Sequence, residues 1–247
     1  MNHYKIIIPF YNVENWIKLC VRSVIAQKYT DFQCILINDC SIDNSKVVVK
    51  DLIKNDSRFV LLNNENKKYA LKNIIDGINY SNPKDNDIIL TLDGDDWLHK
   101  ETVLDTLNDV YNNTKCLITY GNYAEFPSAR TMSHMQRYSE DIINNNSYRK
   151  DIWKATHLRT FKFILWKNIE QKDFLDEDGS YLDVTWDMAF MFPMLEMAGN
   201  RQEFIKDILY VYNRMNPIND DKIKRDRQLY YERIIRNRKK YNKLELK

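Results

Sequence analysis

Acidic side chains follow two apolar runs of this sequence, and they are the residues best suited to chemistry. Asp93 and Asp95 come directly after the run 87–92, and Asp39 comes after the run 32–37. Carboxylates that gather in one place repel each other unless a cation lies between them. Mg²⁺ and Mn²⁺ prefer oxygen ligands, and Mg²⁺ commonly binds one or two carboxylates together with substrate phosphates. Asp93 and Asp95 are therefore candidate ligands of a divalent ion that holds a phosphorylated substrate.

The same Asp-Gly-Asp-Asp segment also has a purely structural interpretation. Asp-Gly pairs are common in turns, and Asp96 could cap the helix that follows. The sequence contains neither Gly-x-x-x-x-Gly-Lys nor Gly-x-Gly-x-x-Gly, so a P-loop and a glycine-rich dinucleotide fold are not supported. A bound nucleotide would need another means of attachment, and a metal ion is the obvious one.

The elements that position these aspartates alternate between strand and helix over the first 120 residues. Short β-branched runs predict buried strands, and apolar residues at helical spacing predict helices between them. We expect strands at 4–9, 32–37, 59–62, 87–92 and 116–120. Helices are expected at 13–25, after the second strand until about residue 55, at 69–80 and at 100–111. Such alternation predicts a mainly parallel sheet with helices on both faces. Ligands of these sheets bind beyond the carboxyl ends of the strands, where the aspartates lie.

The pattern changes after about residue 122. The stretch to 150 is polar and predicts loop with some helix, and 151–200 predicts helices, including one at 184–198. A late strand is expected at 208–213. The segment 220–243 predicts a basic helix, whose apolar side would carry Tyr230, Tyr231, Ile234 and Tyr241.

Composition indicates a globular protein. Of the 247 residues, 44% are hydrophobic and 29% charged, and only 5 are Gly and 5 Pro, which excludes fibrous and low-complexity classes. No apolar run approaches the ~18 residues of a membrane span, and the N-terminus lacks a secretory pattern. The four cysteines form no metal or disulfide pattern and are expected to be free thiols. We expect a cytoplasmic protein without a transmembrane segment.

Charge is unevenly distributed, although the net charge is only +2. Eleven Lys and Arg residues but three acidic ones follow Asp221. A basic C-terminal segment on an acidic body suggests contact with an anionic surface or partner. A solvated helix is the equally open alternative. We do not expect nucleic-acid binding.

Four segments, in this order, resemble family 2 glycosyltransferases of the GT-A fold. They are Ile-Ile-Ile-Pro-Phe-Tyr-Asn-Val-Glu (6–14), Ile-Asn-Asp-Cys-Ser-Ile-Asp (37–43), the stretch from Asn66 to Lys72-Asn73, and Leu-Asp-Gly-Asp-Asp (92–96). The resemblance covers the first 120 residues closely and continues loosely to about residue 220. It implies an α/β fold with a mainly parallel central sheet flanked by helices and a helical C-terminal extension. The implied parts are a nucleotide-sugar-binding half (1–122), an acceptor-binding half of the same domain (123–220) and a basic C-terminal helix (221–247).

The resemblance also implies an activity, namely inverting transfer of a sugar from a nucleoside diphosphate to a hydroxyl of a glycan or glycoconjugate. Pro9, Tyr11, Glu14 and Asp39 match the positions that hold the base and ribose in the family. A carboxylate that accepts the uracil N3–H discriminates against bases without that donor. The residues on either side of Asp39 depart from the family pattern. The resemblance therefore favours UDP as the donor nucleotide but does not determine it.

Further positions follow from the same resemblance. Lys72 and Lys68 occupy positions from which a side chain could reach the nucleotide, although surface solvation explains either lysine equally well. Asp93 and Asp95 match the family's metal motif, which implies Mn²⁺ or Mg²⁺ on the leaving diphosphate. The resemblance places the general base at Asp187, where an acidic pair is usual and only the second acid is present; Asp183 is the alternative.

Other polar and aromatic residues have two interpretations. His157 and Arg159 are candidate site residues, although a lone His is more often part of the core. Arg159 or Arg214 could bind the diphosphate or an anionic acceptor. The tryptophans 153, 166 and 186 could stack on a sugar or simply pack.

Two other functions remain open. A non-catalytic module could keep the nucleotide fold and use its basic segment to bind an anionic partner, since one acid of the usual pair is missing at Trp186-Asp187. A sugar nucleotidyltransferase uses a related sheet, but its Gly-rich opening is absent here.

Overall fold

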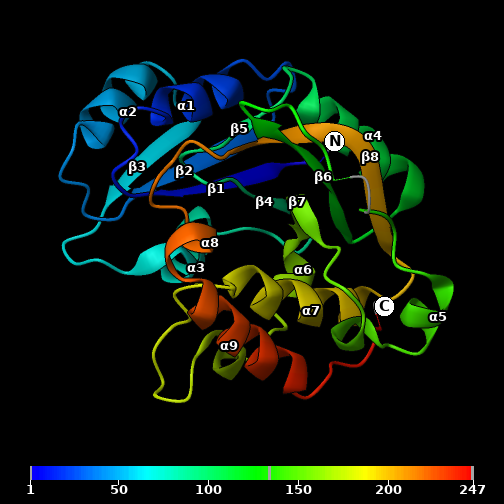
Figure 1. The fold of residues 1–247 in the computed structure, drawn as a ribbon. Helices are drawn as coiled ribbons and strands as arrows, with labels where there is room; N and C mark the ends of the chain where they lie inside the picture. Colours follow the sequence, from blue (N-terminus) through cyan, green and yellow to red (C-terminus); the bar gives the residue numbers. More distant parts are fainter. Residues whose placement is uncertain (1, 133–134, 246–247) are drawn as a thin grey trace.

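The computed structural model describes residues 2–132 and 135–245, except the side chains of residues 220 and 221. Its centre is an eight-stranded sheet with the strand order β3-β2-β1-β4-β7-β6-β8-β5. Helices cover both faces of this sheet (Figure 1). The strands are β1 (Tyr4–Phe10), β2 (Phe32–Asn38), β3 (Phe59–Asn63), β4 (Ile88–Thr91), β5 (Trp97–Leu98), β6 (Ile118–Phe126), β7 (Thr156–Lys162) and β8 (Gln202–Asn213).

Half of the sheet is parallel, as the sequence predicts. Strands β3, β2, β1 and β4 are parallel neighbours, and Phe10 at the end of β1 pairs with Asn38 at the end of β2. All seven residues of β1 are buried because helices cover the strand on both sides. This arrangement places the carboxyl ends of β1, β2 and β4 at one edge, where Asp39 directly follows β2 and Asp93 lies two residues beyond β4.

The other half of the sheet is mixed, and here the predicted boundaries are wrong. Strand β7, within a region predicted to be helical, lies antiparallel between β4 and β6. Its polar residues 157 and 159 are buried on the sheet, so neither strand alternation nor a continuous apolar run marks the segment. Strands β6 and β8 run parallel to each other and are longer than predicted.

Helices divide between the two faces. One face packs against α1 (Ile17–Ile25), α2 (Ser45–Ile53) and α4 (Val103–Thr114). The other face packs against α3 (Tyr69–Ser81), α6 (Phe163–Trp166), α7 (Trp186–Ala198) and α9 (Arg225–Asn237). The short elements are α5 (Glu140–Asn144), α8 (Asp220–Ile223) and two 3₁₀ turns (Tyr148–Lys150 and Gln171–Phe174).

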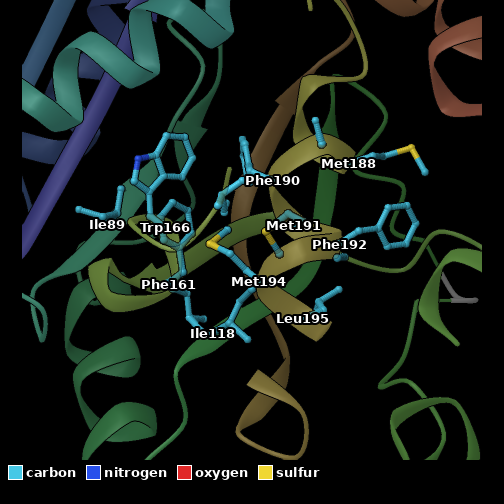
Figure 2. Close-up of a cluster of buried hydrophobic side chains, with 14 of the residues drawn as sticks. Ile89, Ile118, Phe161, Trp166, Met188, Phe190, Met191, Phe192, Met194 and Leu195 are labelled. Atoms are coloured by element: carbon cyan, nitrogen blue, oxygen red, sulfur yellow. The ribbon is translucent and has the colours of Figure 1, made fainter. Parts of the chain in front are cut away.

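Helix α7 is the centre of the second core and is almost entirely buried. Figure 2 shows its side chains beside Phe161 of β7 and Trp166 of α6. The Trp166 ring stacks on Phe161 and on Phe174. Trp166 is therefore a core residue, and its predicted alternative role in sugar stacking is wrong.

The predicted C-terminal helix is broken into α8, α9 and a segment without helix over 238–245. Tyr231 and Ile235 face the core, whereas Tyr230 is 48% exposed, because adjacent helical residues point in directions about 100° apart. Tyr241 lies beyond the end of the helix. The expectation of one continuous helix with both Tyr230 and Tyr231 on its apolar side is wrong.

A buried ion pair attaches this C-terminal segment to α7. Arg149 binds Glu196 through two hydrogen bonds of 2.6 and 2.9 Å, and both side chains are almost fully buried. Arg149 also donates to the Ile235 carbonyl of α9, and Glu196 accepts from the Tyr241 backbone amide. Several basic residues of the segment are therefore engaged within the chain, including Arg236, which binds the carbonyls of Arg149 and Asp151.

All four cysteines are free thiols, as expected. No helix within the described ranges is long and apolar enough to cross a membrane.

Candidate active site

A cavity of about 440 Å³ opens at the carboxyl ends of β1, β2 and β4. It brings together predicted residues that are far apart in the sequence. Among those that line it are Pro9, Tyr11, Asp39, Asp93, Asp95 and Asp187. Because α7 and α9 supply the opposite wall, the cavity lies between the sheet edge and the C-terminal helices.

Asp39 is held firmly at the end of β2. It is 3% exposed and accepts hydrogen bonds from the backbone amides of Lys68 and Tyr69 and from the Asn64 side chain, at 2.8 to 2.9 Å. The two amides belong to the start of α3, whose unpaired N–H groups need acceptors. A carboxylate has about four acceptor positions, so Asp39 keeps one for a ligand.

The Asp-Gly-Asp-Asp turn packs tightly against the end of β1. The Gly94 amide donates to the Pro9 carbonyl at 3.2 Å, and the Asp96 amide donates to the Asp93 carbonyl at 3.0 Å. A Cβ atom on Gly94 would lie 2.5 Å from the Cβ of Phe10. Only glycine fits this close approach, which fixes the positions of Asp93 and Asp95 on either side of it.

Replacing Gly94 with Ala is therefore expected to destabilise the fold by about 1–3 kcal/mol, because the turn must move away from β1. Urea unfolding measures this change. Ser57→Ala, on an exposed residue, is the control and should change the free energy of unfolding by less than about 0.5 kcal/mol. Equal stability of the Gly94→Ala and Ser57→Ala variants would contradict the tight packing described here.

Asp96 has a structural role that differs from the predicted one. It is 1% exposed and accepts from the Tyr210 hydroxyl at 2.5 Å and from the Asn213 amide at 2.7 Å, both from β8. Burial, with the nearby Asp95 and Asp93, raises the pKa of Asp96 well above its usual value. The predicted helix cap is wrong, since the N-cap of α4 is Thr102. Asp96 instead connects the turn to β8.

Asp93 and Asp95 have the donor set of a magnesium-type or manganese-type site. Both line the cavity, and Asp95 also accepts from the Asn216 side chain at 2.7 Å. Within the described parts of the chain, no three His, Cys, Asp or Glu side chains form a complete metal-binding group. Mg²⁺ often takes few protein ligands and completes its coordination with phosphates and water. Two carboxylates on one rigid turn fit that mode of binding.

Asp187 lies in the first turn of α7, and Arg159 of β7 holds it in place. The Arg159 Nη2 atom donates to Asp187 Oδ2 at 2.7 Å, and Arg159 is nearly buried. Thr185, just before α7, has a φ of +56°, which is rare for a β-branched residue. Among the described residues, Asp187 Oδ1 has no hydrogen-bond partner. One oxygen is thus fixed by Arg159, and the side chain lines the cavity.

His157 and Arg159 act as a pair on β7. Arg159 Nη2 lies 3.3 Å from His157 Nε2, and the His157 ring stacks on Tyr210 at 4.2 Å. Arginine only donates, so Nε2 must be the unprotonated nitrogen. Burial and the charge of Arg159 lower the pKa of His157 well below its usual value. His157 is therefore a neutral packed residue that also lines the cavity.

Several predicted nucleotide contacts lie outside the cavity lining. Glu14 accepts from the backbone and side chain of Asn44 at the start of α2, at 2.9 and 3.0 Å. Lys72 and Lys68 both pair with Asp76 of α3. The geometry gives these three side chains structural partners and does not bring them to the cavity.

Two further candidates are also engaged elsewhere. Asp183 binds Arg227 at 2.8 Å and precedes α7, so it does not share a helix face with Asp187. Arg214 pairs with Glu125 at 2.9 Å. Of the aromatic candidates, Trp153 and Trp186 line the cavity.

The wall formed by the C-terminal segment was not predicted from the sequence. Asn216, Ile218, Arg225, Gln228 and Glu232 all line the cavity. The signal in the sequence is the spacing of Arg225, Gln228 and Glu232, which places them on one face of a helix.

A family model described as "Glycosyl transferase family 2" matches residues 5–174. The chain belongs to this family. The match covers the parallel half of the sheet, the Asp-Gly-Asp-Asp turn and β7, and ends before Asp187. Family membership does not support the nucleotidyltransferase alternative.

Curated relatives agree with this assignment. The chain is 27% identical over 164 residues to glycosyltransferase GlyA of Streptococcus pneumoniae, covering 64% of this chain and 23% of GlyA. It is 26% identical over 220 residues to GlyG of the same organism, covering 85% of this chain and 70% of GlyG.

Solved structures of glycosyltransferases share the fold. TarS of S. aureus matches with a TM-score of 0.69 and 16% identity, over 94% of this chain and 39% of TarS. The mannosyltransferase PcManGT from Pyrobaculum calidifontis, in complex with GDP-Man and Mn²⁺, matches with a TM-score of 0.64 and 14% identity, over 97% of this chain and 66% of that one. The predicted GT-A fold with its mainly parallel central sheet is confirmed.

Proposed function

We propose that this protein is an inverting glycosyltransferase that moves a sugar from a nucleoside diphosphate, with UDP favoured, to a hydroxyl of a glycan or glycoconjugate. The observation that carries the proposal is the convergence of Asp39, Asp93, Asp95 and Asp187 on one cavity. A TarS structure with the same fold is a complex with UDP-GlcNAc. A relative from Escherichia coli, 31% identical over 143 residues, is named as a glucosyltransferase that uses UDP-Glc and a diphosphoundecaprenol-linked acceptor.

The donor nucleotide is assigned to the sheet side of the cavity. Asp39 offers its remaining acceptor position to the uracil N3–H, while Pro9 and Tyr11 line the wall beside it. Asp93 and Asp95 would hold Mn²⁺ or Mg²⁺. The bound ion would neutralise the charge that develops on the leaving diphosphate.

The acceptor reacts on the side of α7. The free Oδ1 of Asp187 takes the proton of the acceptor hydroxyl while the hydroxyl oxygen attacks the anomeric carbon. The new carbon–oxygen bond forms opposite the bond to the diphosphate, which breaks, so the anomeric configuration inverts. Arg159 keeps the Asp187 carboxylate oriented during this step.

Calorimetric titration of UDP with and without Mn²⁺ tests the donor site. We expect Mn²⁺ to tighten UDP binding about ten-fold or more, since the cation offsets the charge of the diphosphate. Asp95→Asn should abolish this gain, whereas Asp109→Asn, on an exposed residue of α4, should retain it. Equal metal enhancement in Asp95→Asn and in the unsubstituted protein would overturn the metal assignment.

A panel of UDP-sugars tests catalysis. Slow, metal-dependent release of UDP from one cognate donor is expected, because water replaces the acceptor. Binding of UDP without release from any donor would favour the non-catalytic module.

A further inference from the structure

One wall of the cavity comes from the C-terminal helix and has no role in the chemistry described above. Arg225, Gln228 and Glu232 lie at i, i+3 and i+7 of α9 and all line the cavity. The Thr185 hydroxyl donates to the Gln228 carbonyl at 3.2 Å. Because Thr185 is two residues before Asp187, this wall lies beside the proposed base.

The wall is anchored from several directions. Asp183 binds Arg227 at 2.8 Å and Lys224 at 3.3 Å, which fixes the start of α9 against the segment before α7. Farther along, the Arg149 side chain donates to the Ile235 carbonyl at 2.7 Å. The side chains facing the cavity therefore project from a fixed helix.

Arg225 differs from the other described charged residues of the cavity in having no partner. Among the charged cavity residues that the structure describes, the aspartates and Arg159 all have partners, and Glu232 pairs with Arg236. Within the same described part of the chain, the exposed Arg225 side chain has no hydrogen bond or ion pair. It places an unneutralised guanidinium on the wall beside Asp187.

The neighbouring surface suits a sugar. Trp153 and Trp186 also line the cavity, and Trp186 directly precedes Asp187 in the sequence. Ligand sites commonly combine aromatic walls with a few polar groups that fix orientation. Beside Arg225, the Gln228 amide offers both a donor and an acceptor for hydroxyl groups.

We infer that the α9 wall is the acceptor site and that the acceptor carries an oxyanion, a phosphate or a carboxylate, which Arg225 binds. This inference rests on the proposed function, since it takes Asp187 as the base that faces the acceptor. A guanidinium binds either oxyanion through two parallel hydrogen bonds. Arg225 lies on α9, whereas Asp93 and Asp95, which are assigned to the donor diphosphate, belong to the turn after β4.

The test uses protein saturated with UDP and Mn²⁺, so that the donor site is filled. Three probes are titrated and followed by NMR: glucose 1-phosphate, methyl glucuronide and the neutral methyl glucoside. We expect at least one anionic probe to bind about ten-fold more tightly than the neutral glucoside. Arg225→Gln should remove this preference, while Arg233→Gln, on an exposed residue of the same helix outside the cavity lining, should keep it.

Two results would overturn the inference. One is equal binding of all three probes by the unsubstituted protein. The other is a loss of UDP affinity in Arg225→Gln as large as the loss for the anionic probe, which would assign Arg225 to the donor diphosphate. Failure of the proposed function would appear earlier and separately, as absence of metal-enhanced UDP binding in the unsubstituted protein.

Discussion

Replacing Asp187 with Asn is expected to lower the rate of sugar transfer by about 10²–10⁴-fold, because the acceptor hydroxyl loses its proton acceptor. The amide preserves the shape of the side chain and can still accept from Arg159 through its oxygen. UDP affinity should therefore change by less than about two-fold. Initial rates with saturating donor, together with UDP titration, measure the two quantities.

Two variants accompany this measurement. Asp207→Asn, on an exposed residue of β8, should leave the rate unchanged. Asp183→Asn tests the alternative base; because Asp183 pairs with Lys224 and Arg227, we expect it to weaken acceptor binding rather than the maximal rate. A large fall in the maximal rate for Asp183→Asn, with Asp187→Asn near normal, would exchange their roles.

Replacing Arg149 with Met is expected to destabilise the protein by about 3–5 kcal/mol, since it leaves the Glu196 carboxylate buried without its partner. The variant also removes the hydrogen bond to the Ile235 carbonyl. The midpoint of urea unfolding should therefore fall sharply. Activity should fall with it, because α9 loses a main attachment to the body of the protein.

An exposed pair and a double variant make this prediction specific. Lys54→Met breaks an exposed ion pair with Asp51 and should cost less than about 1 kcal/mol. The double variant Arg149→Met with Glu196→Leu should recover much of the lost stability, because an apolar pair replaces the buried charges. If Arg149→Met proves no more harmful than Lys54→Met, the buried pair does not hold the C-terminal segment.

The parallel half of the fold could be predicted from the sequence, because its signal is local. Strands β1, β2 and β4 are short β-branched runs buried on both faces, and the helices between them have regular apolar spacing. Topology then places their carboxyl ends together. This rule alone brings Asp39, Asp93 and Asp95 to one edge, as the cavity lining shows.

The second half could not be predicted in the same way, because its structure depends on contacts between residues far apart in the sequence. Strand β7 buries Arg159 and His157, which become acceptable in a core only through Asp187 and Tyr210. Helix α9 has the composition of a solvated basic helix. Its attachment depends on Arg149, and the sequence alone does not indicate that this residue contacts α9.

The position of α9 in the chain has a consequence for biosynthesis. During translation the carboxylate turn and its sheet emerge first, and α9 leaves the ribosome after all the other walls of the cavity. Until α9 has been synthesised, one wall of the cavity is therefore missing. The cavity is complete only once α9 has docked against the segment before α7.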